Sequence, residues 1–254
     1  MTTLVEPVQI AYNTISMFAI IIKDLYRYAD RPKYRLIQFS IVSLISAIFF
    51  IATIEYFFST RSNSQTDTGR SVFVILVSTL FVVITGVVTP IFAIESIQDE
   101  RCNTNFDLLH LSRLSTVQIL LGKLTGVLLA SFSLILMTAP IFILSTYTGG
   151  FKLRDLLTCG IVFLSANLLF VLISFSLALS LHENILSCSY GTILAVTFLP
   201  LVAPKPIWWI SPLTILIEIV QLESNPKVWL SVGGYFAVAL LIFILVKQRL
   251  AFKI

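Results

Sequence analysis

The residues with the most informative spacing lie in a charged stretch between two apolar runs of the chain. From Ser96 to Ser115 the stretch reads Ser-Ile-Gln-Asp-Glu-Arg-Cys-Asn-Thr-Asn-Phe-Asp-Leu-Leu-His-Leu-Ser-Arg-Leu-Ser. Thr104 and Asp107 have the spacing of a capping box, which predicts that a short helix begins there. A second capping box, Ser115 with Gln118, predicts the start of the next long helix.

The predicted short helix carries apolar side chains between charged ones, at Leu108, Leu109 and Leu111. A water-exposed helix with this pattern usually packs against a partner surface, so the chemistry it offers is protein docking. The alternative is a short helix that merely lies on a membrane.

Patterns for catalysis and metal binding are missing from the sequence. It contains no H-E-x-x-H, no G-x-S-x-G and no G-x-x-x-x-G-K-[ST] loop, because Gly122 and Lys123 are followed by Leu124 and position 117 holds no glycine. The two histidines and three widely spaced cysteines form neither a metal framework nor a CxxC pair. We therefore expect no enzyme activity, no bound metal and no ATP hydrolysis by this chain itself.

Composition indicates which elements position these residues. Of the 254 residues, 57% are apolar and 12% are charged, whereas ordinary soluble domains have about 45–50% and about 25%. With a mean hydropathy of +0.96, the chain has too little polar surface for a soluble globule, so we expect an integral membrane protein. The net charge of +4 comes from basic residues at the ends of apolar runs, which indicates topology anchors and not nucleic-acid binding.

Six apolar stretches approach the roughly 20 residues that a helix needs to cross a bilayer. They predict an all-α membrane fold with spans at 36–58, 72–94, 117–147, 156–181, 185–203 and 228–246. Lys123 lies near the start of the third span, where we expect its long side chain to reach back to the interface.

The region ahead of the first span, residues 1–34, is expected to form an amphipathic helix. One apolar stripe runs through Ala11, Ile15, Phe18, Ile22, Leu25 and Ala29. Because Asn13, Ser16 and Lys23 are costly in lipid, we expect this helix to lie in the interface plane, and a seventh spanning helix is the alternative. Residues 35–254 then form the six-span domain.

Basic residues predict the orientation. Of the 17 Lys and Arg residues, 11 lie in the N-terminal segment, the connection between spans two and three, and the C-terminus, and 6 lie on the opposite side. The positive-inside rule then places both termini in the cytoplasm, in agreement with an even number of spans.

The stretch before the last span, 204–227, does not fit the spanning pattern. It contains four prolines, and its helix-like part, Pro212–Leu222, is too short to cross a bilayer. We expect a re-entrant or surface-lying excursion with short helices on the outer side.

Three polar residues in apolar surroundings are candidates for a substrate path: Glu55, Asn167 and Glu218. Glu55 and Glu218 lie near an interface, where solvation also explains them. For Asn167, a hydrogen bond to a neighbouring helix is the favoured interpretation.

The charged stretch resembles a motif of the integral permease subunits of ABC-2 type transporters, E-R-E-x-G-T-L-E-L-L-L-L-T-P-L-S followed by I-x-x-G-K. The matching positions are Glu100, Arg101, Phe106, Asp107, Leu108, Leu109, Leu111, Leu114, Ser115, Ile119, Gly122 and Lys123. This chain departs from the motif at Cys102, where the family has a second acid, at Thr104-Asn105, where it has Gly-Thr, and at Arg113, where it has proline. These departures change the turn chemistry around the predicted short helix.

The resemblance implies that residues 98–115 form a cytoplasmic coupling helix that docks into a groove on an ABC ATPase. Phe106, Leu108 and Leu109 would supply the apolar contact, and Glu100, Arg101, Asp107 and Arg113 would set the register.

In the complex that the resemblance implies, the chain pairs with a second permease, identical or different. Two cytoplasmic ATPase subunits bind ATP and Mg and drive export of an unidentified substrate across the cell (inner) membrane. A membrane channel, a non-transporting membrane scaffold and an intramembrane enzyme are the alternatives.

Overall fold

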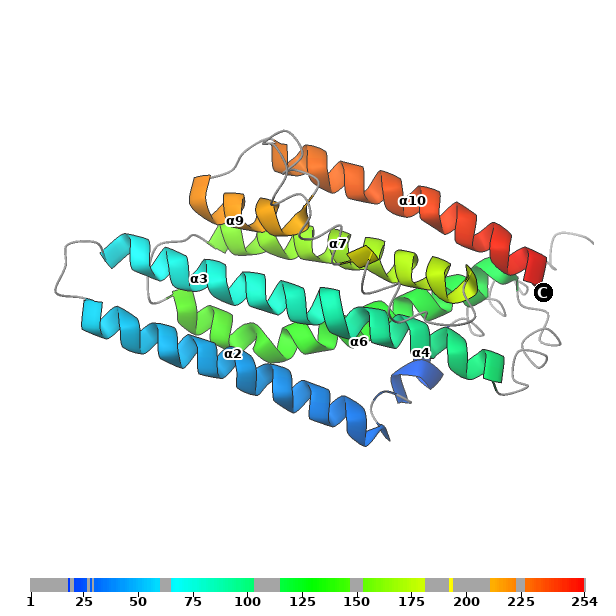
Figure 1. Cartoon of the computed structure of the whole chain (residues 1–254), viewed down its shortest axis with the longest axis horizontal. Helices are drawn as coiled ribbons and strands as arrows, with labels where there is room; N and C mark the ends of the chain where they lie inside the picture. The colour runs from blue at the N-terminus through cyan, green and yellow to red at the C-terminus, as the bar shows by residue number, and fades with distance from the viewer. Residues whose placement is uncertain are drawn as a thin grey trace, which may run out of the picture.

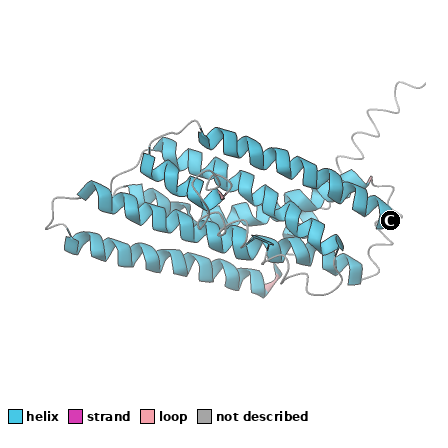
Figure 2. Cartoon of the chain, turned by 45° about the horizontal axis from the view of Figure 1, so that its top comes forward, coloured by secondary structure: helices cyan, strands magenta, loops and turns pink. Residues whose placement is uncertain are grey.

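The computed structural model describes residues 18, 21–26, 28, 30–59, 65–102, 115–146, 153–180, 192–193, 211–222 and 227–253. Within these ranges all residues are helical except Arg31, Ser115 and Ser211, and no strand occurs among them (Figure 2). The expectation of an all-α fold is therefore confirmed for the part of the chain that is described.

Four long helices carry most of the apolar sequence: α2 (Pro32–Ser59), α6 (Thr116–Thr146), α7 (Leu153–Ser180) and α10 (Lys227–Lys253). A fifth apolar stretch consists of three consecutive segments, α3 (Gln65–Phe81), the π-helical η1 (Val82–Val88) and α4 (Thr89–Cys102). The short helix α9 spans Pro212–Leu222. Pro32 and Pro212 begin their helices, where the missing N–H group costs no hydrogen bond.

Five helical stretches are long and apolar enough to cross a membrane: Pro32–Ile54, Arg70–Gln98, Thr116–Ser145, Arg154–Ser180 and Val228–Arg249. They agree with five of the six expected spans. Of the remaining expected span, 185–203, the structure describes only Thr192 and Ile193, so the six-span arrangement stays a prediction. The chain is thus a multi-pass helical membrane protein.

The spans differ in how deeply they lie in the bundle. Figure 1 shows α2 and α10 on opposite sides, with α3, α6 and α7 between them. Helix α7 contacts α4, α6, α9 and α10. The outer helices expose large apolar side chains, such as Phe39 at 75% and Leu230 at 75%. Exposed apolar surface of this kind suits contact with lipid or with another membrane helix.

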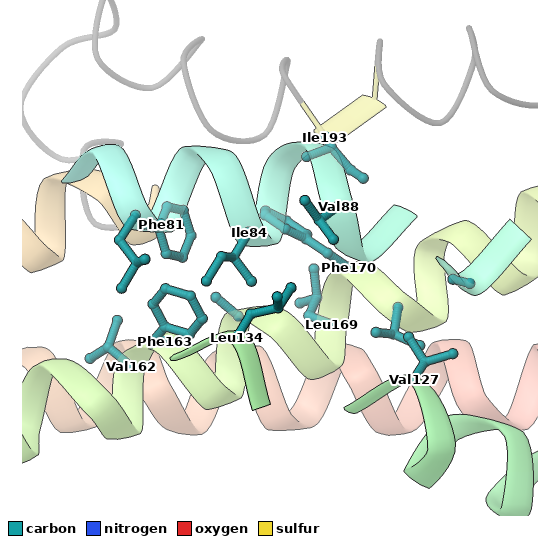
Figure 3. Packing of buried hydrophobic residues seen from close by; sticks show 14 of the residues in the cluster. Phe81, Ile84, Val88, Val127, Leu134, Val162, Phe163, Leu169, Phe170 and Ile193 are labelled. Carbon is teal, nitrogen blue, oxygen red and sulfur yellow. The ribbon is translucent and has the colours of Figure 1, made fainter. Parts of the chain in front are cut away.

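The centre of the bundle is an aromatic and aliphatic core around η1 and α7. Phe81, Ile84 and Val88 point towards α7, where Phe163 and Phe170 meet them (Figure 3). The ring centroids of Phe81 and Phe163 are 5.5 Å apart and edge to face, which is a favourable geometry for an aromatic pair.

The second span is not the uninterrupted helix that its apolar run predicted. Pro90 has no N–H group to donate to the carbonyl of Gly86, and its ring crowds that carbonyl. The helix widens just before the proline, and the Thr89 N–H donates to the Ile84 carbonyl, five residues back. A π-helical turn is a recognised consequence of such a disturbance in a helix.

Candidate functional site

The coupling segment predicted for residues 98–115 is described at its two ends. Glu100 and Arg101 belong to the last turn of α4, which ends at Cys102. The other predicted coupling residues, Phe106, Asp107, Leu108, Leu109 and Arg113, lie outside the described residues. Their docking role stays a prediction.

The capping box predicted at the far end of this segment is confirmed. The Ser115 N–H donates to Gln118 Oε1 at 2.9 Å, and the Gln118 N–H donates to Ser115 Oγ at 3.3 Å. The Gln118 N–H also donates to the Ser115 carbonyl at 2.9 Å. Together these bonds fix the residue at which α6 starts.

A buried lysine joins the helices that enter and leave the coupling segment. Lys123 of α6 is 5% exposed, and its Nζ atom donates to the carbonyl of Ser96 in α4 at 2.5 Å. The Ser96 hydroxyl lies 3.3 Å from the same nitrogen. The expectation that Lys123 reaches back to the interface is therefore wrong, because its buried ammonium group donates a hydrogen bond from α6 to α4.

Two tyrosines, Tyr28 ahead of α2 and Tyr34 in the first turn of α2, pack against the same pair of helices. The Tyr28 hydroxyl donates to the Phe92 carbonyl of α4 at 3.2 Å. The Tyr34 hydroxyl donates to the Ala130 carbonyl of α6 at 3.1 Å. Both rings also stack near Phe92, with centroid distances of 5.0 Å and 5.4 Å. Each tyrosine thus gives apolar contact and a hydrogen bond to one of the two helices.

An ion pair and a close backbone approach add to this contact. Arg31 Nη1 lies 3.3 Å from Glu95 Oε2, with both side chains more than a third exposed, so the pair contributes little energy. Asp24 is buried against Gly126, where an added Cβ would lie 3.3 Å from the Asp24 Cβ. A side chain at position 126 would press on Asp24, which would have to shift by a few tenths of an ångström.

The face that the N-terminal segment turns to the bundle differs from the stripe read from the sequence. Ile21, Asp24 and Tyr28 are buried, whereas Phe18 and Ile22 of the predicted stripe are 55% and 49% exposed. The apolar stripe is therefore available to lipid, and the packing face includes an acid and a tyrosine. Ile21, Asp24 and Tyr28 have the spacings of three and four that mark one face of a helix. Because they differ in polarity, they do not form an apolar stripe that the sequence pattern could reveal.

Three spans are joined by a chain of buried side-chain hydrogen bonds. The Thr89 hydroxyl of α4 donates to Asn167 Oδ1 of α7 at 2.8 Å, and Asn167 Nδ2 donates to Ser131 Oγ of α6 at 2.7 Å. Asn167 is 1% exposed. We call these three residues the polar triad. They confirm the interpretation that Asn167 bonds to a neighbouring helix.

Of the other two candidates for a substrate path, the structure describes the side chain of one. Glu218 lies half-buried in α9, and Glu55 belongs to α2, where its side chain lies outside the described part. A cavity of about 270 Å³ lies between α3, α6 and α7, but its walls are apolar and include neither Asn167 nor Glu218. A substrate path through Glu55, Asn167 and Glu218 stays a prediction.

Within the described ranges, no three His, Cys, Asp or Glu side chains come close enough to hold a metal ion. In comparisons with known proteins, the chain matches no family model and no curated protein sequence. The class established by the fold is a multi-pass helical membrane protein.

Proposed function

We propose that this chain is the membrane-spanning permease subunit of an ATP-driven ABC exporter of the ABC-2 type. It pairs with a second permease and with two cytoplasmic ATPase subunits, and ATP and Mg bind to those ATPases. The exported substrate is not specified by any residue described above. The observation that carries the proposal is the charged, leucine-bearing motif between the second and third spans.

The surroundings of the motif support this proposal physically. A segment that transmits force needs firmly anchored ends, since loose ends absorb the motion. Here α6 starts at a capped Ser115, and Lys123 ties α6 to Ser96 near the inner end of α4. Tyr28, ahead of α2, and Tyr34, in its first turn, hold the same two helices. A push on the coupling segment therefore reaches several helices together.

Coupling also requires that the ATPase bind two permease conformations with different free energies. In the proposed mechanism, ATP closes the ATPase pair and shifts the docked coupling segments. Leu108 and Leu109 supply buried contact, and Arg101, Asp107 and Arg113 select the partner by charge. The spans then change from an inward-facing to an outward-facing arrangement.

The test is the double variant Leu109→Asp with Arg101→Glu. It places a charge in the docking contact and reverses a second charge, so transport and co-purification of the ATPase should fall at least about tenfold. The matched control is Leu153→Asp with Arg154→Glu at the start of α7, on the expected outer side, which should leave both unchanged. Equal ATPase co-purification with the double variant and the wild type would contradict the proposal.

A further inference from the structure

The second span contains a buried hydroxyl, that of Thr85, to which the described part of the chain offers no hydrogen-bond partner. Thr85 lies within η1 and is 0% exposed, and its Oγ1 atom finds no hydrogen-bond partner among the described residues. Several threonine hydroxyls in the α-helical parts of this chain bond to a carbonyl of their own helix. Thr53 donates to the Phe49 carbonyl at 2.6 Å, and Thr125 donates to the Leu121 carbonyl at 2.8 Å.

The π-helical turn explains why Thr85 differs from these residues. A threonine hydroxyl in an α-helix reaches the carbonyl three or four residues back. In η1 the backbone is wound more widely, as the bond from the Thr89 N–H to the Ile84 carbonyl shows. The π form therefore leaves one buried polar group unsatisfied, which disfavours it.

The polar triad has the opposite effect on the same turn. Thr89 is the first residue after η1, so the extra residue in the π turn determines which direction its side chain faces. In this register Thr89 meets Asn167, and Asn167 meets Ser131. In a continuous α-helix each residue is turned by about 100° and advanced by about 1.5 Å. Loss of the π turn would turn Thr89 by that step and carry its hydroxyl away from Asn167.

We propose that η1 is a register switch within the second span. The π register is stabilised by the polar triad and by Pro90, whose ring would crowd the Gly86 carbonyl in a continuous α-helix. The α register is stabilised by a carbonyl partner for Thr85. A change of register turns α4 relative to α3, and α4 leads directly to the predicted coupling segment. The switch is a property of the span itself, whereas its use in coupling rests on the proposed function.

The test measures a distance between two spin labels in the purified chain, reconstituted in lipid vesicles without an ATPase. The labels replace Gln98 of α4 and Lys247 of α10, and the native cysteines are replaced by alanine. Thr89→Val removes the bond to Asn167, so a second distance should rise about fivefold in population, the change that one net hydrogen bond produces. Adding Thr85→Val should reverse that rise, because the α register then gains no bond.

Thr53→Val is the matched control, since that hydroxyl bonds within α2 alone. It should leave a single distance. An unchanged distance distribution in Thr89→Val, or a second distance that persists in the double variant, would overturn the switch. Should Thr89→Val fail to fold, Ser131→Ala weakens the same triad from its other end, and a folded Ser131→Ala without the second distance overturns it equally.

The outcome separates the switch from the proposed function. A second distance in a chain that binds no ATPase leaves the switch intact and removes its role in coupling. A chain that binds an ATPase but shows one distance in every variant keeps the permease proposal and excludes the switch.

Discussion

Two prolines lie within two helices that pack against each other, and the backbone around them differs. Pro140 lies inside α6, which stays α-helical from Thr116 to Thr146. Pro90 follows the π-helical η1 after a single residue, Thr89. Pro140 is exposed, as are Leu136 and Met137 on the preceding turn, whereas Pro90 is buried. A proline therefore does not by itself produce a π turn, and the surroundings decide.

The surroundings of Pro90 contain specific partners for one register. Thr89 next to it bonds to Asn167, and Ile84 and Val88 pack in the core around Phe170 (Figure 3). The turn around Pro140 has exposed apolar side chains, which meet lipid or another chain equally well in several orientations. The comparison shows that a helix stays α-helical around a proline at an exposed site, whereas it forms a π turn ahead of a proline at a packed site.

The largest expected effect comes from removing each proline in turn. Pro90→Ala restores an N–H group that can bond to the Gly86 carbonyl, so α4 should turn and the label distance between Gln98 and Lys247 should change. Pro140→Ala should raise the free energy of unfolding by up to about 3 kcal/mol without changing that distance. A π turn that survives in Pro90→Ala would show that the proline is not its cause.

Removing the centre of the polar triad should have the next largest effect. Asn167→Leu leaves the buried Thr89 and Ser131 hydroxyls without their interhelical partner, so the free energy of unfolding should fall by about 2 kcal/mol. Ser165→Ala is the control on α7, since Ser165 bonds to the Val162 carbonyl of its own helix, and it should cost less than about 0.5 kcal/mol. Denaturant titration in mixed micelles measures both, and equal losses would refute a special role of the triad.

The smallest effect is expected where the N-terminal segment contacts α4. Arg31→Ala removes an ion pair whose partners are both partly exposed, so it should change the free energy of unfolding by less than about 0.5 kcal/mol, and less still in high salt. Tyr28→Phe removes a buried hydroxyl bond at the same end and should cost about 1 kcal/mol. A larger loss for Arg31→Ala would show that the N-terminal segment is held mainly by charge.

Features that depend on neighbouring residues in the chain could be predicted from the sequence. The five spans follow from long apolar runs, because each membrane helix satisfies its own backbone and needs no partner to do so. The start of α6 follows from Ser115 and Gln118, which bond within one turn. Helix α9 follows from the short apolar run between prolines at its start and after its end.

Features that depend on contact between distant segments could not be predicted in this way. Lys123 was expected at the interface because hydropathy describes only a residue and its neighbours in the chain. The Ser96 carbonyl that accepts its hydrogen bond is 27 residues away. The packing face of the N-terminal segment was missed because it includes the polar residue Asp24. The sequence does not show that Gly126 lies opposite Asp24. Pro90 was visible in the sequence, but a proline inside a membrane span predicts either a kink or a π turn.

The sequence by itself determined that this chain crosses a membrane several times as helices, and that it carries a charged, leucine-bearing connection between two of them. The reason is that hydropathy and capping act over one or two helical turns. Only the tertiary structure decided the register of the second span, the partner of Lys123 and the bonds of Asn167. In each case the alternatives have similar local energies, and contacts with the neighbouring helix determine which one is adopted.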